Sequence, residues 1–126
     1  MYLCEDDKFD QFVVEAYNKL PKKFLKKIDN VEIVVESESL GFGGTNLLGL
    51  YSGIPLSHRS TSYGMYPVPP DIIRLFKTNI CKIVGSEMEL KSKIFEVLYH
   101  EIGHYFGMNE EQIRDSMKEF RLEHFD

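Results

Sequence analysis

Residues 100–104 read His-Glu-Ile-Gly-His, which is the spacing H-E-x-x-H. Side chains at positions i and i+4 lie one above the other on a helix, so the imidazoles of His100 and His104 can reach one metal ion at about 2.0–2.1 Å. Glu101 points about 100° around the helix from His100, close enough to hydrogen-bond a water on that ion without occupying the metal. The spacing therefore predicts a metal site with Glu101 as the general base of a hydrolytic reaction.

A catalytic zinc ion usually has three protein ligands and keeps its fourth position for water. Gly107 follows His104 by three residues, and a helix can end there through a left-handed glycine, with Glu110 and Glu111 coming shortly after. On a continuous helix Glu110 would lie about 9 Å along the axis from His104, so only a turn at Gly107 lets it share the ion. Glu110 is the predicted third ligand, and Glu111 stays an alternative. Acids of the last predicted helix, Glu119 or Glu123, are a further alternative.

Two histidines four residues apart can also be ordinary polar residues on a helix. The apolar residues of this helix form an arc that excludes both histidines: Ile94, Phe95, Leu98, Tyr99, Ile102, Tyr105 and Phe106. His100 and His104 are therefore predicted to face solvent or a cleft and not the core. The chain also spends two of its four histidines on this one pattern, which favours a metal site.

The elements that must position these residues follow from periodicity and from breaks in it. An apolar stripe with helical spacing ends at Pro21, and runs of β-branched residues indicate strands within a loop-rich central region. The predicted helices cover residues 9–20, 24–28, 87–106 and 110–120, and the predicted strands cover residues 31–35, 47–51 and 72–76. This order predicts an α+β domain with a small sheet.

The composition is that of an ordinary globular protein, with 126 residues, 43% hydrophobic and 28% charged. This length fits one domain over residues 1–126. The net charge of −5 argues against a nucleic-acid partner. A local group of lysines is interpreted as a solvated helix face; it consists of Lys19, Lys22, Lys23, Lys26 and Lys27. Cys4 and Cys81 do not form a disulfide framework.

The sequence carries no secretory signal at its start and no apolar run of the roughly 20 residues that cross a bilayer. We therefore expect a cytoplasmic protein without a membrane partner.

Residues 98–113, LYHEIGHYFGMNEEQI, resemble the signature of the minimal zincins, a family of small bacterial zincin-like metallopeptidases. The family pattern is H-E-x-x-H-x-x-G-x-x-[D/E], and its five positions are occupied by His100, Glu101, His104, Gly107 and Glu110. Residues 47–60, LLGLYSGIPLSHRS, are similar to the family's Leu-x-Gly-x-Tyr-x-Gly-x-Pro-Leu stretch. Aspartate is common at the third-ligand position of the family, whereas this chain has the longer glutamate.

The resemblance implies a compact zincin-like α+β domain, with a small mixed sheet packed against an active-site helix and two further helices. It also implies one Zn²⁺ ion bound by His100, His104 and Glu110, with Glu101 as the base. The predicted function is a zinc-dependent metallopeptidase that acts on a peptide or protein substrate.

A non-catalytic regulatory or peptide-binding module on the same metal-binding scaffold is the alternative. A purely structural zinc site is disfavoured, because such sites are normally closed by four ligands and no fourth is evident.

The remaining expectations concern substrate binding and the long central loop. A bound peptide is expected to pair with an edge strand formed by residues 72–76. Candidates for stabilising an oxyanion come from the long loop: His58, Arg59, Tyr63 and Tyr66. Tyr51, Gly53 and Pro55 are expected to shape a turn.

Overall fold

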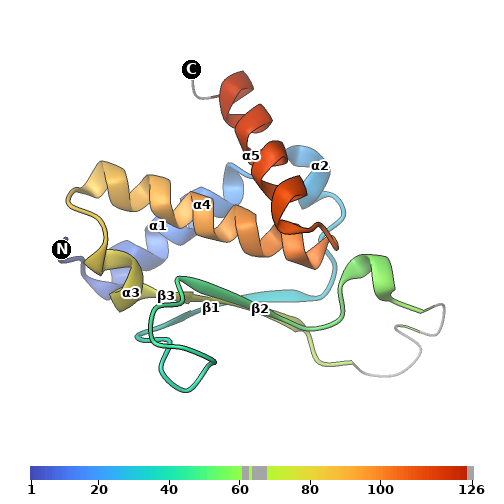
Figure 1. Ribbon diagram of the computed structural model, residues 1–126, viewed down its shortest axis with the longest axis horizontal. Coiled ribbons are helices and arrows are strands. Elements are labelled where there is room, and N and C mark those ends of the chain that lie inside the picture. The colour runs from blue at the N-terminus through green and yellow to red at the C-terminus, as the bar shows by residue number, and fades with distance from the viewer. Residues whose placement is uncertain (61–62, 64–67, 125–126) are drawn as a thin grey trace.

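The computed structural model describes residues 1–60, 63 and 68–124 (Figure 1). Helices and strands alternate irregularly along the chain. In order they are α1 (Asp6–Asn18), α2 (Lys22–Leu25), β1 (Val31–Glu36), β2 (Gly49–Ser52), the 3₁₀ turn η1 (Leu56–His58), β3 (Asp71–Phe76), α3 (Lys77–Lys82), α4 (Glu87–Tyr105) and α5 (Glu110–His124). The predicted α+β class is confirmed.

The two long helices that carry the core form where the apolar periodicity predicts them. In α1 the residues Phe9, Phe12, Val13 and Ala16 of the stripe are buried, and Pro21 comes three residues after the helix ends at Asn18. Helix α4 begins after Ser86, whose side chain accepts a hydrogen bond from the Glu89 N–H at 3.2 Å and so satisfies one free donor of the first turn. Its long apolar arc includes Leu90, Ile94, Leu98 and Ile102, all fully buried.

The sheet has the strand order β1-β3-β2, with β1 parallel and β2 antiparallel to β3. Residues 72–76 therefore lie in the central strand, and the prediction that they form an edge is wrong. The apolar run indicates a strand but not its neighbours in the sheet, which are set by tertiary packing. The described strands leave β1 and β2 at the two edges.

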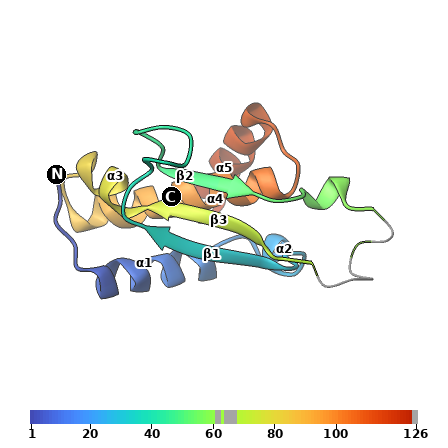
Figure 2. The ribbon, with the colours of Figure 1, turned by 90° about the horizontal axis from the view of Figure 1, so that it is seen from below.

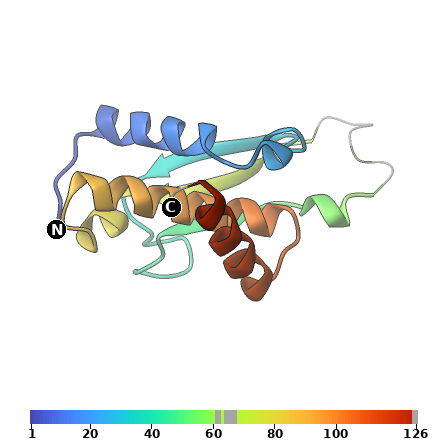
Figure 3. The ribbon, with the colours of Figure 1, turned by 90° about the horizontal axis from the view of Figure 1, so that it is seen from above.

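Helices α1 and α4 lie side by side over one face of the sheet, as the views from below and above show (Figures 2 and 3). The core between these layers joins α1 to β3 and α4, with Phe9, Ile73, Leu75, Leu90 and Ile94 at its centre. Helix α5 crosses α4 on the side away from the sheet (Figure 1). Among the described residues, no helix has the length and apolar character that crossing a membrane requires.

Helix α3 was not predicted from the sequence, since Thr78, Asn79, Ile80 and Cys81 are weak helix formers. Its buried Asn79 explains why it forms here. The Asn79 Nδ2 donates to Ser39 Oγ at 2.6 Å and to the Leu47 carbonyl at 2.8 Å. The helix is therefore held by the loop that leads into β2, which local propensity cannot reveal.

A buried polar network ties the start of β3 to the loop after β2. The Asp71 carboxylate accepts hydrogen bonds from the Tyr51 hydroxyl at 2.5 Å and from an Arg59 terminal nitrogen at 3.1 Å. The side chains of Asp71 and Arg59 are each 5% exposed, so the two charges are removed from water together. Gly53 passes so close that an added Cβ would meet Asp71 Cγ at 2.2 Å. The network fixes strand β2 against β3.

Replacing Asp71 with asparagine keeps the shape of the side chain but leaves the buried Arg59 guanidinium with only the exposed Asp29 carboxylate, at 3.4 Å, as a counter-charge. We expect Asp71→Asn to lower the free energy of unfolding by about 3 kcal/mol, because breaking one partner of a buried pair is costly. Urea unfolding followed by circular dichroism measures the change. The matched control is Glu87→Gln, which removes an exposed pair with Lys8 and should leave the urea midpoint nearly unchanged. Equal midpoints for both variants would contradict a structural role for the buried pair.

Candidate metal centre

The two histidines lie on the last two turns of α4, on the face turned away from the core. Their side chains are 35% and 31% exposed, so neither is a core histidine, as the apolar arc predicted. The Nε2 atoms of His100 and His104 are 3.1 Å apart. The i, i+4 spacing thus brings both imidazole nitrogens to one point above the helix.

The chain reverses direction immediately after this turn. The N–H of Gly107 donates to the His104 carbonyl at 2.9 Å, and the N–H of Met108 donates to the Gly103 carbonyl at 3.0 Å. These two bonds form a Schellman motif, which ends a helix through a left-handed residue. Gly107 has φ +84°, and an added Cβ would also meet Ser57 Oγ at 2.2 Å. The left-handed conformation favours glycine here, and any side chain at this position would also have to displace that of Ser57.

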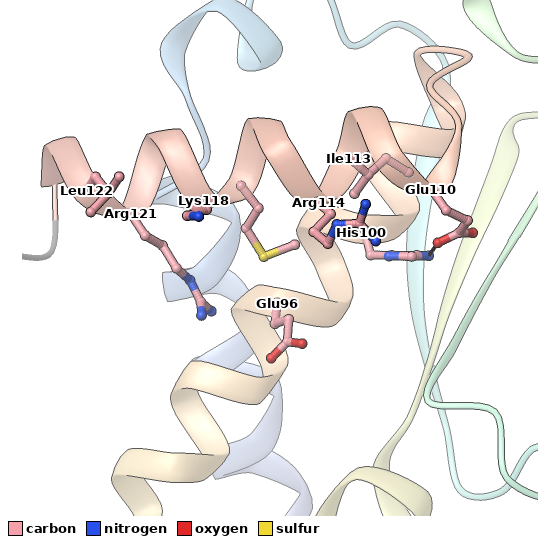
Figure 4. A pocket seen from close by; sticks show the side chains of 9 residues that line it. Glu96, His100, Glu110, Ile113, Arg114, Lys118, Arg121 and Leu122 are labelled. Carbon is pink, nitrogen blue, oxygen red and sulfur yellow. Dashed lines mark ion pairs between the residues drawn. The ribbon is translucent and has the colours of Figure 1, made fainter.

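A capping box starts the next helix. Asn109 Oδ1 accepts from the Gln112 N–H, and Gln112 Oε1 accepts from the Asn109 N–H, both at 2.8 Å. Glu110 is therefore the first residue of α5, and its carboxylate reaches back to α4. Its two oxygens lie 3.0 Å from His104 Nε2 and 3.1 Å from His100 Nε2 (Figure 4 shows Glu110 and His100).

His100, His104 and Glu110 form a group of donor atoms that suits a metal ion. The donor atoms of a tetrahedral zinc site, each about 2.1 Å from the ion, are separated from one another by about 3.4 Å. The two Nε2 atoms are 3.1 Å apart and each lies 3.0–3.1 Å from a different oxygen of Glu110, which is close to this value. Among the described residues the group has three members, and the exposed Glu111 is not one of them. Glu119 and Glu123 line a separate pocket beside Tyr99.

Glu101 is not one of the three donor residues and is only 8% exposed, and together with His100 it lines a pocket between α4 and β2. Burial raises the pKa of its carboxyl group, while His100, His104 and a backbone hydrogen bond from Tyr51 act in the opposite direction. Strand β2 comes unusually close, because a Cβ added to Gly49 would lie 3.2 Å from Glu101 Cγ. The carboxylate is thus enclosed between α4 and the edge strand.

The alternation of hydrogen bonds along β2 explains the contact with Tyr51. The Phe76 N–H donates to the Leu48 carbonyl, and Gly49 and Tyr51 are paired with Leu75 and Ile73. In an antiparallel ladder, backbone groups point to the partner strand at every second residue. Those of Gly49 and Tyr51 therefore point to the open edge, where Glu101 lies. Tyr51 is part of a strand, so the expectation that it shapes a turn is wrong.

The family model for zincin-like metallopeptidases matches residues 28–119. This range includes His100, Glu101, His104 and Glu110 as well as strands β2 and β3. The chain belongs to the zincin-like metallopeptidase family. The fold is also similar to that of a conserved hypothetical protein from Thermus thermophilus, with a TM-score of 0.53 and 19% identity over 82% of this chain and 94% of that chain. No curated protein matches the chain.

Of the loop residues proposed to stabilise an oxyanion in this zincin-like protein, two have structural partners. Arg59 is held by Asp71, and its guanidinium lies over the Tyr63 ring at 4.2 Å. The Tyr63 hydroxyl accepts from Asn30 Nδ2 at 3.0 Å. His58 is exposed at the end of η1, and Tyr66 lies outside the described residues.

Sequence reasoning missed several residues that build the site. The capping box of Asn109 and Gln112 has a recognisable spacing, N-x-x-Q, directly before the predicted last helix. No local signal could have identified the backbone of Tyr51 as a partner of Glu101, because strand β2 and helix α4 are far apart in the chain.

Gly103, inside the motif, allows α5 to pack closely on α4. An added Cβ would lie 2.5 Å from Ile113 Cγ1, and Ile113 is 1% exposed. We expect Gly103→Ala to lower the free energy of unfolding by about 1–3 kcal/mol through overpacking. This is opposite to the gain of about 1 kcal/mol that alanine brings in an exposed helix.

A double-mutant cycle tests this contact. Ile113→Ala alone should cost about 2–5 kcal/mol, and the double variant should be clearly more stable than the sum of the single changes predicts. Chemical denaturation supplies all four values. Strict additivity would show that Gly103 and Ile113 do not meet.

Proposed function

We propose that this protein is a zinc-dependent hydrolase of the metallopeptidase type, with one zinc ion held by His100, His104 and Glu110 and with Glu101 as its general base. The main observation behind the proposal is the convergence of His100, His104 and Glu110, whose donor atoms all lie within 4.8 Å of one another, with the buried carboxylate of Glu101 next to His100 in the chain. The donor set of two imidazoles and one carboxylate is that of catalytic zinc sites, which keep an open position.

Zinc at this position would supply a Lewis acid and lower the pKa of its water towards 7. The protein contributes the proton transfers. Because burial raises the pKa of Glu101, its carboxylate is a stronger base than that of an exposed glutamate. It is suited to accept the proton of an attacking water and then to deliver it to the leaving nitrogen. The hydrogen bond from Tyr51 opposes this rise of the pKa and so favours the ionised, proton-accepting form.

The peptide would bind along β2 in this proposal. The outward backbone groups of Gly49 and the outward carbonyl of Tyr51 lie at the edge of the sheet, where an extended peptide can add as a strand. A pocket of about 240 Å³ separates this edge from α4 and is lined by Gly49, Val97, His100 and Glu101, among others. A peptide paired with β2 would therefore pass beside both the metal ligands and the base.

The ligand assignment can be tested by zinc titration against a chromophoric chelator. Glu110→Ala should weaken zinc binding by about 100-fold or more, since it removes one of three ligands. Glu111→Ala is the matched control with the same change in charge one residue away, and its affinity should stay within about twofold. Similar zinc affinities for the two variants would exclude Glu110 as the ligand.

The role of Glu101 separates an enzyme from a non-catalytic metal-binding module. Cleavage of a pool of quenched fluorescent peptides should fall by about 10²–10⁴-fold in Glu101→Gln. Zinc affinity should be retained, because the side chain is not in the ligand group. Cleavage that persists unchanged in Glu101→Gln would indicate a contaminant or another mechanism. A zinc-loaded wild type that binds peptides but cleaves none would support the non-catalytic alternative.

A further inference from the structure

A second pocket, of about 520 Å³, opens beside His100 between α4 and α5 (Figure 4). Its wall on α5 carries three cationic side chains and the ligand candidate Glu110, and α4 contributes a second acid, Glu96, together with His100. The cations are Arg114, Lys118 and Arg121. The pocket therefore has a different chemical character from the narrow space between α4 and β2.

The three cations lie on the same face of α5 as the ligand candidate Glu110. Arg114, Lys118 and Arg121 follow Glu110 at intervals of four, four and three residues, so all lie on one face of α5. The helical rise places Arg114 about 6 Å and Lys118 about 12 Å from Glu110 along the axis. Figure 4 shows Arg121 reaching down from α5 towards α4 and Arg114 near His100.

Both acids of the pocket already have ionic partners. Glu96 is paired with Lys93 of its own helix at 3.0 Å, and Glu110 contacts His100 and His104. Arg121 donates to the Ser92 carbonyl at 3.4 Å. Arg114 and Lys118 form no ion pair with another residue in the described part of the chain. The pocket thus presents two cations without a paired acid on a chain whose net charge is −5.

We propose that this pocket is a subsite for a carboxylate of the substrate, bound chiefly by Arg114. The inference rests on the proposed function and names its substrate class, peptides with a carboxylate close to the cleaved bond. A guanidinium can hold a carboxylate through two parallel hydrogen bonds, and Met117 offers an apolar surface beside it. An extended chain rises about 3.3 Å per residue, so Arg114 lies about two residues from the metal group. The carboxylate comes from an Asp or Glu side chain or from a free C-terminus.

Binding to zinc-loaded Glu101→Gln tests the subsite without turnover. Three fluorescent decapeptide pools share degenerate flanks; one has a central Glu and an amidated end, one a central Gln and an amidated end, and one a central Gln and a free C-terminus. We expect at least one carboxylate pool to bind about tenfold more tightly than the neutral pool. The pool that gains identifies the source of the carboxylate. Equal affinity of all three pools overturns the proposal.

Charge variants locate the preference. Adding Arg114→Gln should reduce the tenfold difference to about onefold, whereas Lys82→Gln, an exposed lysine at the end of α3, should preserve it. The preference should also weaken as salt is raised. A preference that survives in Arg114→Gln shows that the carboxylate binds elsewhere.

Cleavage of the same pools by the wild type separates the two proposals. Carboxylate-selective binding without any cleavage supports the subsite and contradicts the hydrolase. Cleavage without carboxylate selectivity, unchanged in Arg114→Gln, supports the hydrolase and contradicts the subsite.

Discussion

The metal group depends on the reversal of the chain between α4 and α5. A ligand only six residues beyond His104 can return to the same point because Gly107 adopts a left-handed conformation and the capping box starts a new helix two residues later. The close contact of Gly103 with Ile113 then sets how near the two helices lie. The turn alone would leave the distance between Glu110 and the histidines undetermined. Conformation and packing together fix it.

Helix α4 directs side chains into three different surroundings, because the residues concerned lie on different faces of the helix. One face supplies the fully buried residues that hold the sheet and α1, a second face presents the histidines, and Glu101 points between them towards β2. The buried Asp71 and Arg59 pair is therefore relevant to the site, although it lies outside it. It fastens Tyr51 to β3, and the backbone of Tyr51 in turn hydrogen-bonds Glu101.

The part of the site that is local in sequence could be predicted, and the part that depends on tertiary pairing could not. His100, His104, Gly107 and Glu110 lie within two helical segments and one turn, so spacing and glycine conformation were sufficient to predict their grouping. The central position of β3 was not predictable in the same way, since strand order is set by packing against α1 and α4. Helix α3 likewise depends on the contacts of Asn79 with a distant loop.

Strand β2 and helix α5, which line the two pockets beside His100, permit different kinds of recognition. Strand β2 offers backbone groups and a glycine, which bind the main chain of a peptide whatever its sequence. Helix α5 offers long charged side chains, which distinguish one side chain from another. Affinity for an extended chain is therefore expected from the sheet, and selectivity from α5. Because Glu110 belongs to the same helix as Arg114, a substrate that meets the selective wall also lies along the line that leads to the metal ligands.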